Sequence, residues 1–167
     1  MPLPKKRLSV IGVLVLGCHT ASESGELFDV KSTFVSSSCG AAVDIDDGET
    51  FQVRLTYADD SLTWYELDTG ETTQGSISDN AFTLAEVTGY QMTAATGYDP
   101  GCAVRRHDAY SGTFTKTAER VSRFAATVVS NYSEASGYTC DSLIGVSGGF
   151  TDLPCTVNYT LVGTAAD

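Results

Sequence analysis

The sequence has few basic residues, few histidines and no apolar run long enough to cross a membrane as a helix. Its 167 residues include 10 Lys and Arg against 21 Asp and Glu, a formal net charge of −11. Such an acidic surface repels phosphate backbones and anionic headgroups, so nucleic-acid binding and membrane docking through basic residues are both disfavoured. Its apolar stretches fall well short of the roughly 20 residues that a spanning helix needs.

The scarcity of histidine limits catalysis and metal binding. His19 lies in a polar segment near the N-terminus and His107 stands alone, so no Ser–His–Asp or Cys–His arrangement can be assembled. No pair of cysteines has the CxxC spacing, and no histidine is placed to complete a zinc site. We therefore expect a protein that is not an enzyme and that needs neither a metal nor another cofactor.

The first residues have the order of a secretory signal peptide. Basic residues at 5–7 are followed by an apolar run at 8–16 and then by Gly17-Cys18. A cationic start, a short apolar run and a small residue at the break are typical of a segment that directs export. Residues 1–17 are therefore expected to be a signal peptide.

The end of this segment, Val15-Leu16-Gly17-Cys18, resembles the lipobox of bacterial lipoproteins. The resemblance implies that the Cys18 thiol receives a diacylglyceryl group, that signal peptidase II cuts before Cys18, and that the new amine is often acylated. His19 replaces the aspartate that retains such proteins in the inner membrane, which implies the outer membrane of a Gram-negative-type bacterium. A signal peptide cut by the general signal peptidase is the alternative.

The rest of the chain is predicted to form a short tether and one domain. Residues 18–25 are polar and are expected to be a lipidated, flexible tether, and residues 26–167 have the size of one ordinary domain. Removing residues 1–17 takes away three basic residues and no acidic one. Seven basic residues then stand against 21 acidic ones, a net charge of −14.

The number of cysteines is odd, which calls for an explanation in an exported protein. Assigning Cys18 to the lipid leaves an even number, enough for two disulfides in an oxidising compartment. The four remaining cysteines are Cys39, Cys102, Cys140 and Cys155.

A period of two dominates the domain and predicts an all-β fold. The clearest strand is 51–57, in which apolar residues alternate with polar ones. About eight strands are expected, at 28–34, 51–57, 61–67, 75–77, 82–84, 104–114, 124–132 and 155–162. Since most connections are short, the simplest topology is a single small antiparallel up-and-down meander. The layout resembles lipocalin-type and avidin-type β-barrels in architecture alone, and a β-sandwich is the alternative.

The long connections of such a meander all emerge at one end, and so do the four cysteines. These connections are residues 35–50, 88–101 and 133–154. If the sheet closes, the first strand neighbours the eighth and the sixth neighbours the seventh, which makes Cys39–Cys155 and Cys102–Cys140 natural pairs. Cys39–Cys102 with Cys140–Cys155 is the rival pairing, and sequence alone leaves the choice open.

The segment 104–110 carries charges in alternation. Arg106 and Asp108 share a face with Val104 and Tyr110, and His107 lies on the other face. If the first face is inward, two charges enter the barrel and need each other or a ligand. We expect instead an exposed row of cross-strand charges. The alternative is a set of polar side chains that bind a ligand in a cavity, and the candidate ligand-binding residues are Arg106, His107, Asp108 and Tyr110.

Two further motifs have simpler interpretations as loops. Gly145-Val-Ser147-Gly-Gly149 matches G-x-S-x-G, but no histidine follows it, so we interpret it as a glycine-rich loop rather than an esterase centred on Ser147. The acidic stretch 44–49 fails the EF-hand spacing and is interpreted as a solvated turn.

The sequence thus predicts an exported lipoprotein, anchored to the membrane through Cys18, with a non-enzymatic binding or envelope-structural barrel. A small apolar ligand is the expected partner of the barrel. The alternative is a protein-binding module, such as an inhibitor of a secreted hydrolase, that uses the long loops.

Overall fold

Eight strands form where the sequence alternates between apolar and polar residues. They are β1 (Glu26–Ser37), β2 (Thr50–Ala58), β3 (Ser61–Glu66), β4 (Thr72–Ser78), β5 (Ala81–Thr93), β6 (Cys102–Lys116), β7 (Val121–Glu134) and β8 (Cys155–Ala165). The computed structural model describes residues 25–45, 47–94, 97, 101–117 and 120–166. No helix in these ranges is long and apolar enough to cross a membrane.

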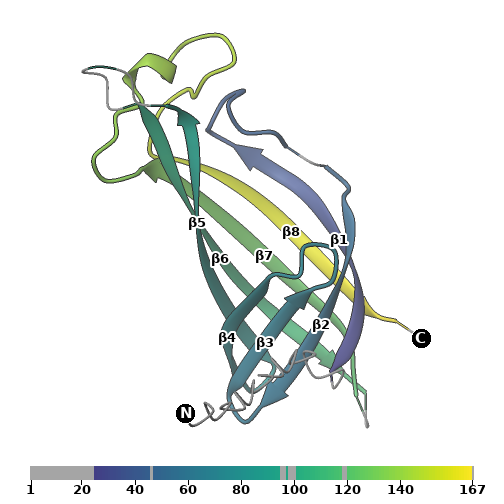
Figure 1. The fold of residues 1–167 in the computed structure, drawn as a ribbon. Coiled ribbons are helices and arrows are strands. Elements are labelled where there is room, and N and C mark those ends of the chain that lie inside the picture. The colour runs from purple at the N-terminus through teal and green to yellow at the C-terminus, as the bar shows by residue number, and fades with distance from the viewer. Residues whose placement is uncertain (1–24, 46, 95–96, 98–100, 118–119, 167) are drawn as a thin grey trace, which may run out of the picture.

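The strands form one closed antiparallel barrel (Figure 1). Each strand pairs with the next, and β8 pairs with β1 over the register Phe28↔Ala165 to Ser37↔Val157. The predicted eight-stranded up-and-down barrel is confirmed, and the β-sandwich alternative is wrong. Closure leaves no sheet edge along the paired length, which is how small all-β proteins avoid edge-to-edge association.

The two ends of the barrel differ. We call the end where β1, β3, β5 and β7 finish the rim, and the opposite end the base. The start of β1 at Glu26 and the end of β8 at Ala165 both lie at the base, together with the short turns at 59–60 and 79–80. The longer connections at 38–49 and 135–154 lie at the rim, as expected.

The barrel wall is lower on one side. Pairing of β4 with β5 extends only to Gly75↔Leu84, and pairing of β1 with β2 only to Lys31↔Thr50. Toward the rim the wall is therefore made of β5, β6, β7, β8 and β1, which rise beyond β2, β3 and β4 in Figure 1. β5 is longer than the sequence predicted, because residues 88–93, expected in a loop, continue the ladder with β6 up to Thr93↔Cys102.

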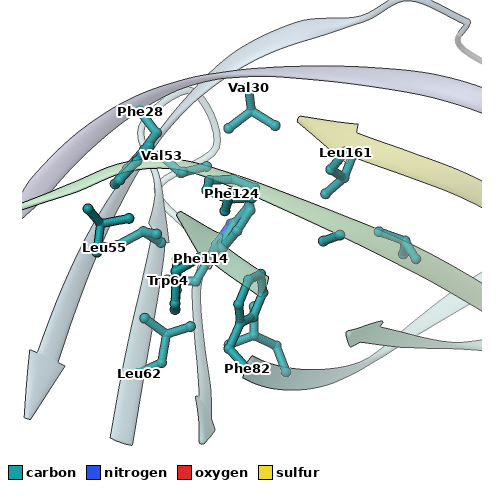
Figure 2. Close-up of a cluster of buried hydrophobic side chains, with 14 residues drawn as sticks. Phe28, Val30, Val53, Leu55, Leu62, Trp64, Phe82, Phe114, Phe124 and Leu161 are labelled. Carbon is teal, nitrogen blue, oxygen red and sulfur yellow. The ribbon is translucent and has the colours of Figure 1, made fainter. Parts of the chain in front are cut away.

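Aromatic side chains fill the base half of the barrel (Figure 2). The Phe124 ring is at the centre, with ring centroids of Phe28 and Trp64 at 5.4 and 5.5 Å. The rings of Phe82 and Phe114 stack at 4.6 Å. Each buried side chain of this size contributes roughly 1.5–3 kcal/mol through removal of apolar surface from water, so the base is the main source of stability.

Two disulfides hold the rim. Cys39 is bonded to Cys155 and Cys102 to Cys140. This is the pairing expected from closure of the sheet, and the rival pairing is wrong. All four cysteines are buried, and they form a second apolar cluster around Phe150.

Candidate functional site

β6 carries the charged pair into the barrel. Arg106 and Asp108 have the same parity along the strand as Val104 and Phe114, which are 1% and 5% exposed. Because successive strand residues point to opposite faces, burial of these two apolar residues forces the charges inward. Asp108 is only 2% exposed. The expectation of an exposed charge row is therefore wrong.

The other candidates divide between the two faces of β6. Tyr110 points inward with Asp108 and lines the interior. His107 is exposed on the outer face, where its register partners are Val87 and Asn131. His107 therefore does not belong to the interior site, because it has the opposite parity from the charged pair.

A cavity of about 220 Å³ lies inside the rim half of the barrel and is partly open to solvent. Its walls come from β1, β2, β6, β7, β8 and the connection at 38–49. Val128 and Leu161 line it and also belong to the aromatic core of the base. The barrel is thus filled at the base and hollow toward the rim.

The charged pair lines this cavity. Arg106 Nε lies 2.7 Å from Asp108 Oδ2, and the two side chains are 32% and 3% exposed. The contact is an ion pair, but its angle does not meet the geometry of a hydrogen bond from Arg106 Nε. The other carboxylate oxygen, Asp108 Oδ1, is buried and has no hydrogen-bond partner among the described residues. The Arg106 guanidinium carbon also lies 5.5 Å from the centroid of the Tyr90 ring, a cation–π distance.

Acidic side chains outnumber basic ones around the cavity, where Asp44 and Glu49 are exposed and Asp108 is buried. Glu86 is the register partner of Asp108 across β5 and β6, and it accepts a hydrogen bond from Thr73 Oγ1 at 3.0 Å. Like charges directly opposite each other on one face of a sheet are destabilising. Arg106 is the one basic residue among those that line the cavity, whereas Asp44, Glu49 and Asp108 are acidic.

The ionisation of neighbouring groups reflects this field. Burial, followed by the charges of Asp108 and Glu86, raises the pKa of Tyr110. Burial and then Glu71 raise the pKa of Glu66 at the end of β3. Burial lowers the pKa of Arg106 and the Asp108 carboxylate raises it; the carboxylate prevails, so the guanidinium keeps its proton.

Several of the residues that line the cavity were not assigned from the sequence. Ser130 and Tyr132 have the same parity as Phe124 and Val128, which point inward from β7, and that parity was a usable signal. Glu49 had no such signal, because stretch 44–49 looks like a solvated turn. In the structure the Glu49 carbonyl accepts a hydrogen bond from Ser32 N at 2.9 Å, and Asp47 Oδ1 accepts one from Phe34 N at 3.0 Å. These bonds occupy the edge of β1 that β2 leaves open.

The remaining motifs form no second site. Ser147 lies in an exposed turn of the rim connection, and no hydrogen bond joins it to His107 in the described part of the chain. Within the same ranges, no group of three His, Cys, Asp or Glu residues is arranged to hold a metal ion. Cys18, the tether up to residue 24, and Asp46 lie outside the described residues.

No protein-family model matches the chain, and no curated protein matches it.

Proposed function

We propose that the protein is an exported, lipid-anchored binding module that holds a small molecule in the rim-half cavity and catalyses no reaction. The observation that carries this proposal is the Asp108 carboxylate, which is 2% exposed and lines the cavity with one oxygen unpaired. Buried polar groups normally have hydrogen-bond partners, so an incompletely paired carboxylate beside a cavity indicates where a ligand donates.

A purely structural role explains the interior less well. The base shows that this sequence can fill the barrel with stacked rings, and a buried charge pair is often no more stabilising than apolar packing of the same volume. Keeping Arg106 and Asp108 at a cavity therefore has a cost that ligand binding would justify. The lining combines these charges with aromatic rings, which suits a ligand with a polar group on an apolar body better than a wholly apolar ligand.

The proposed anchor fits this use of the cavity. A lipid on Cys18 would hold the barrel through residues 18–25, which span at most about 28 Å when extended. Because β1 begins at Glu26 in the base, the tether would join the end opposite the rim. The cavity would then face away from the bilayer, which we propose to be the outer membrane of a Gram-negative-type bacterium.

Native mass spectrometry of the full chain in a non-ionic detergent tests the binding role. We expect the wild type to retain a small molecule and Ser130→Phe to lose it, because Ser130 is buried at the cavity. Asn131→Phe is the matched control, since Asn131 is the next residue and is exposed on the outer face of β7. An unliganded wild type, or equal retention by Ser130→Phe, would refute the proposal.

A second candidate function is supported by the rim surface. Val35, Ile45, Tyr138 and Val146 are among the exposed large hydrophobic residues, and all four lie at the rim. Apolar side chains gathered at a disulfide-held rim favour a protein-binding module, such as an inhibitor of a secreted hydrolase. This alternative predicts inhibition of such a hydrolase by the wild type and loss of inhibition on Tyr138→Asp with Val146→Asp.

A further inference from the structure

The orphan oxygen of Asp108 needs a hydrogen-bond donor. An ionised carboxylate only accepts hydrogen bonds, and it has about four lone-pair positions to satisfy. Arg106 covers one side of it through Oδ2, and Oδ1 faces no donor of the described residues. A ligand that donates to the Asp108 carboxylate from the cavity would therefore complete the site, whereas a second acceptor would be repelled there.

The charges around the cavity select the sign of the ligand. Asp44, Glu49 and Asp108 line the cavity against Arg106 alone, and Glu86 adds a further carboxylate opposite Asp108. Arg106 is already engaged by Asp108 at 2.7 Å and by the Tyr90 ring. An anion would have to compete with Asp108 for this guanidinium and would enter a region of net negative charge, so a cation is favoured.

The aromatic lining suits the same class of ligand. Phe51, Tyr110, Tyr132 and Tyr159 contribute to the cavity wall. Aromatic faces carry partial negative charge and attract a cation, and the same rings pack against an apolar body. Val128 and Leu161 at the boundary with the core offer further apolar surface.

We infer that the cavity binds a small organic cation, a primary or secondary ammonium on an apolar body, whose N–H group donates to the Asp108 carboxylate. This inference rests on the proposed binding function and names its ligand class. The ammonium would lie between the carboxylates and the tyrosine rings, and its apolar part would lie against Val128 and Leu161. A quaternary ammonium, which has charge but no N–H, would contact the rings and leave the carboxylate without this donor.

Four probes with one aromatic body separate these contributions. They are phenethylamine, its trimethylammonium derivative, 2-phenylethanol and phenylacetate, each titrated by calorimetry into the full chain in a non-ionic detergent. We expect phenethylamine to bind most tightly, the trimethylammonium compound more weakly, and the alcohol and the carboxylate at least about tenfold more weakly than the amine. Equal or tighter binding of the alcohol or the carboxylate would overturn the cation inference and leave the small-ligand function standing. Absence of binding by every probe would overturn the inference; the mass-spectrometric result with Ser130→Phe then decides separately whether the cavity holds another small molecule.

Variants place the ammonium at Asp108. Asp108→Asn should weaken amine binding by at least about tenfold, because the amide removes the charge and keeps the shape. The exposed outer-face substitution Asp29→Asn is the control and should leave affinity unchanged.

A folding defect is tested separately. Asp108→Asn leaves Arg106 without its partner, so the double variant Arg106→Gln with Asp108→Asn, which removes both charges, serves as the second test. Its native fold is checked by circular dichroism and by formation of both disulfides. Full amine affinity in a folded double variant would refute the assignment.

Discussion

Gly163 and Gly112 each lie beneath a phenylalanine ring of the base. Gly163 is the register partner of Phe124, and Gly112 is the register partner of Phe82. A Cβ atom added at either position would overlap the facing ring. The absence of a side chain at these two positions therefore makes the space in which the rings of the core stack.

We predict that Gly163→Ala lowers the free energy of unfolding by roughly 1–3 kcal/mol, because a methyl group forces the central Phe124 ring out of its packing. Urea denaturation followed by tryptophan fluorescence measures the change, since Trp64 packs on Phe124. Gly89→Ala is the control, because a Cβ there meets no atom within 4 Å. Equal midpoints for the wild type and Gly163→Ala would contradict this account.

Glu66 predicts a pH-dependent stability. Its pKa is raised by burial and then by nearby carboxylates, namely Glu71, Glu49, Asp68 and Glu86. A carboxyl group with a raised folded-state pKa stabilises the fold while protonated, and this contribution is lost as pH rises through the carboxyl range.

Glu66→Gln should therefore be more stable than the wild type at pH 7 by about 0.5–1 kcal/mol, a modest figure because Glu66 is partly exposed. The difference should disappear below about pH 4, where Glu66 is protonated. Urea midpoints at both pH values measure it. Asp29→Asn should show no such gain, and a Glu66→Gln advantage that persists at low pH would be inconsistent with the electrostatic cause.

The disulfides act at the scale of elements by joining strands that already pair. Cys39 follows β1 and is bonded to Cys155 at the start of β8, and Cys102 at the start of β6 is bonded to Cys140 beyond the end of β7. Both bonds close strand pairs at the rim, where β2, β3 and β4 no longer contribute to the wall. They restrain the end of the barrel that holds the cavity.

Removing either bond by paired Cys→Ser substitution should lower the free energy of unfolding by about 2–4 kcal/mol. The Cys39–Cys155 bond encloses the longer loop, with a sequence separation of 116 against 38, so its loss should cost more. Chemical denaturation of the two double variants measures the order. Non-reducing peptide mapping checks the pairing independently, and a Cys140–Cys155 peptide would contradict it.

At the scale of the whole molecule, one end of the barrel is packed with aromatic rings and the other is hollow and charged. The base contains the stacked rings and both chain ends of the barrel, and the rim half contains the charged cavity. Because the charged cavity and the aromatic core are separated along the axis, charges enter the interior without disturbing the main core. It also puts the proposed anchor at the opposite end from the proposed ligand.

The proposed anchor predicts that Cys18→Ser abolishes membrane association. The wild type expressed in a Gram-negative host should fractionate with the membranes, and mass spectrometry of its N-terminal peptide should show acylated Cys18. The variant should remain in the soluble fraction or retain its leader. Full membrane partitioning of Cys18→Ser after removal of the leader would contradict the lipid anchor, whereas both disulfides should form in either protein.

The sequence by itself determined the fold class and the number of disulfides, and it left their pairing open. Its period of two, short connections and even number of cysteines after Cys18 predicted the eight-stranded barrel and the two disulfides, because local alternation and turn length leave few antiparallel topologies. It also located Arg106, Asp108 and Tyr110 as candidates on one face of β6.

Only the tertiary structure decided which face of β6 points inward and what meets there. Alternation defines two faces without saying which is buried, and the charges of Arg106 and Asp108 favoured an exposed face until closure buried Val104 and Phe114. The contributions of Glu49, Ser130 and Tyr132 come from distant segments that meet only when the barrel closes. The unpaired oxygen of Asp108 also depends on the assembled interior, because only the positions of all surrounding residues show that no donor reaches it.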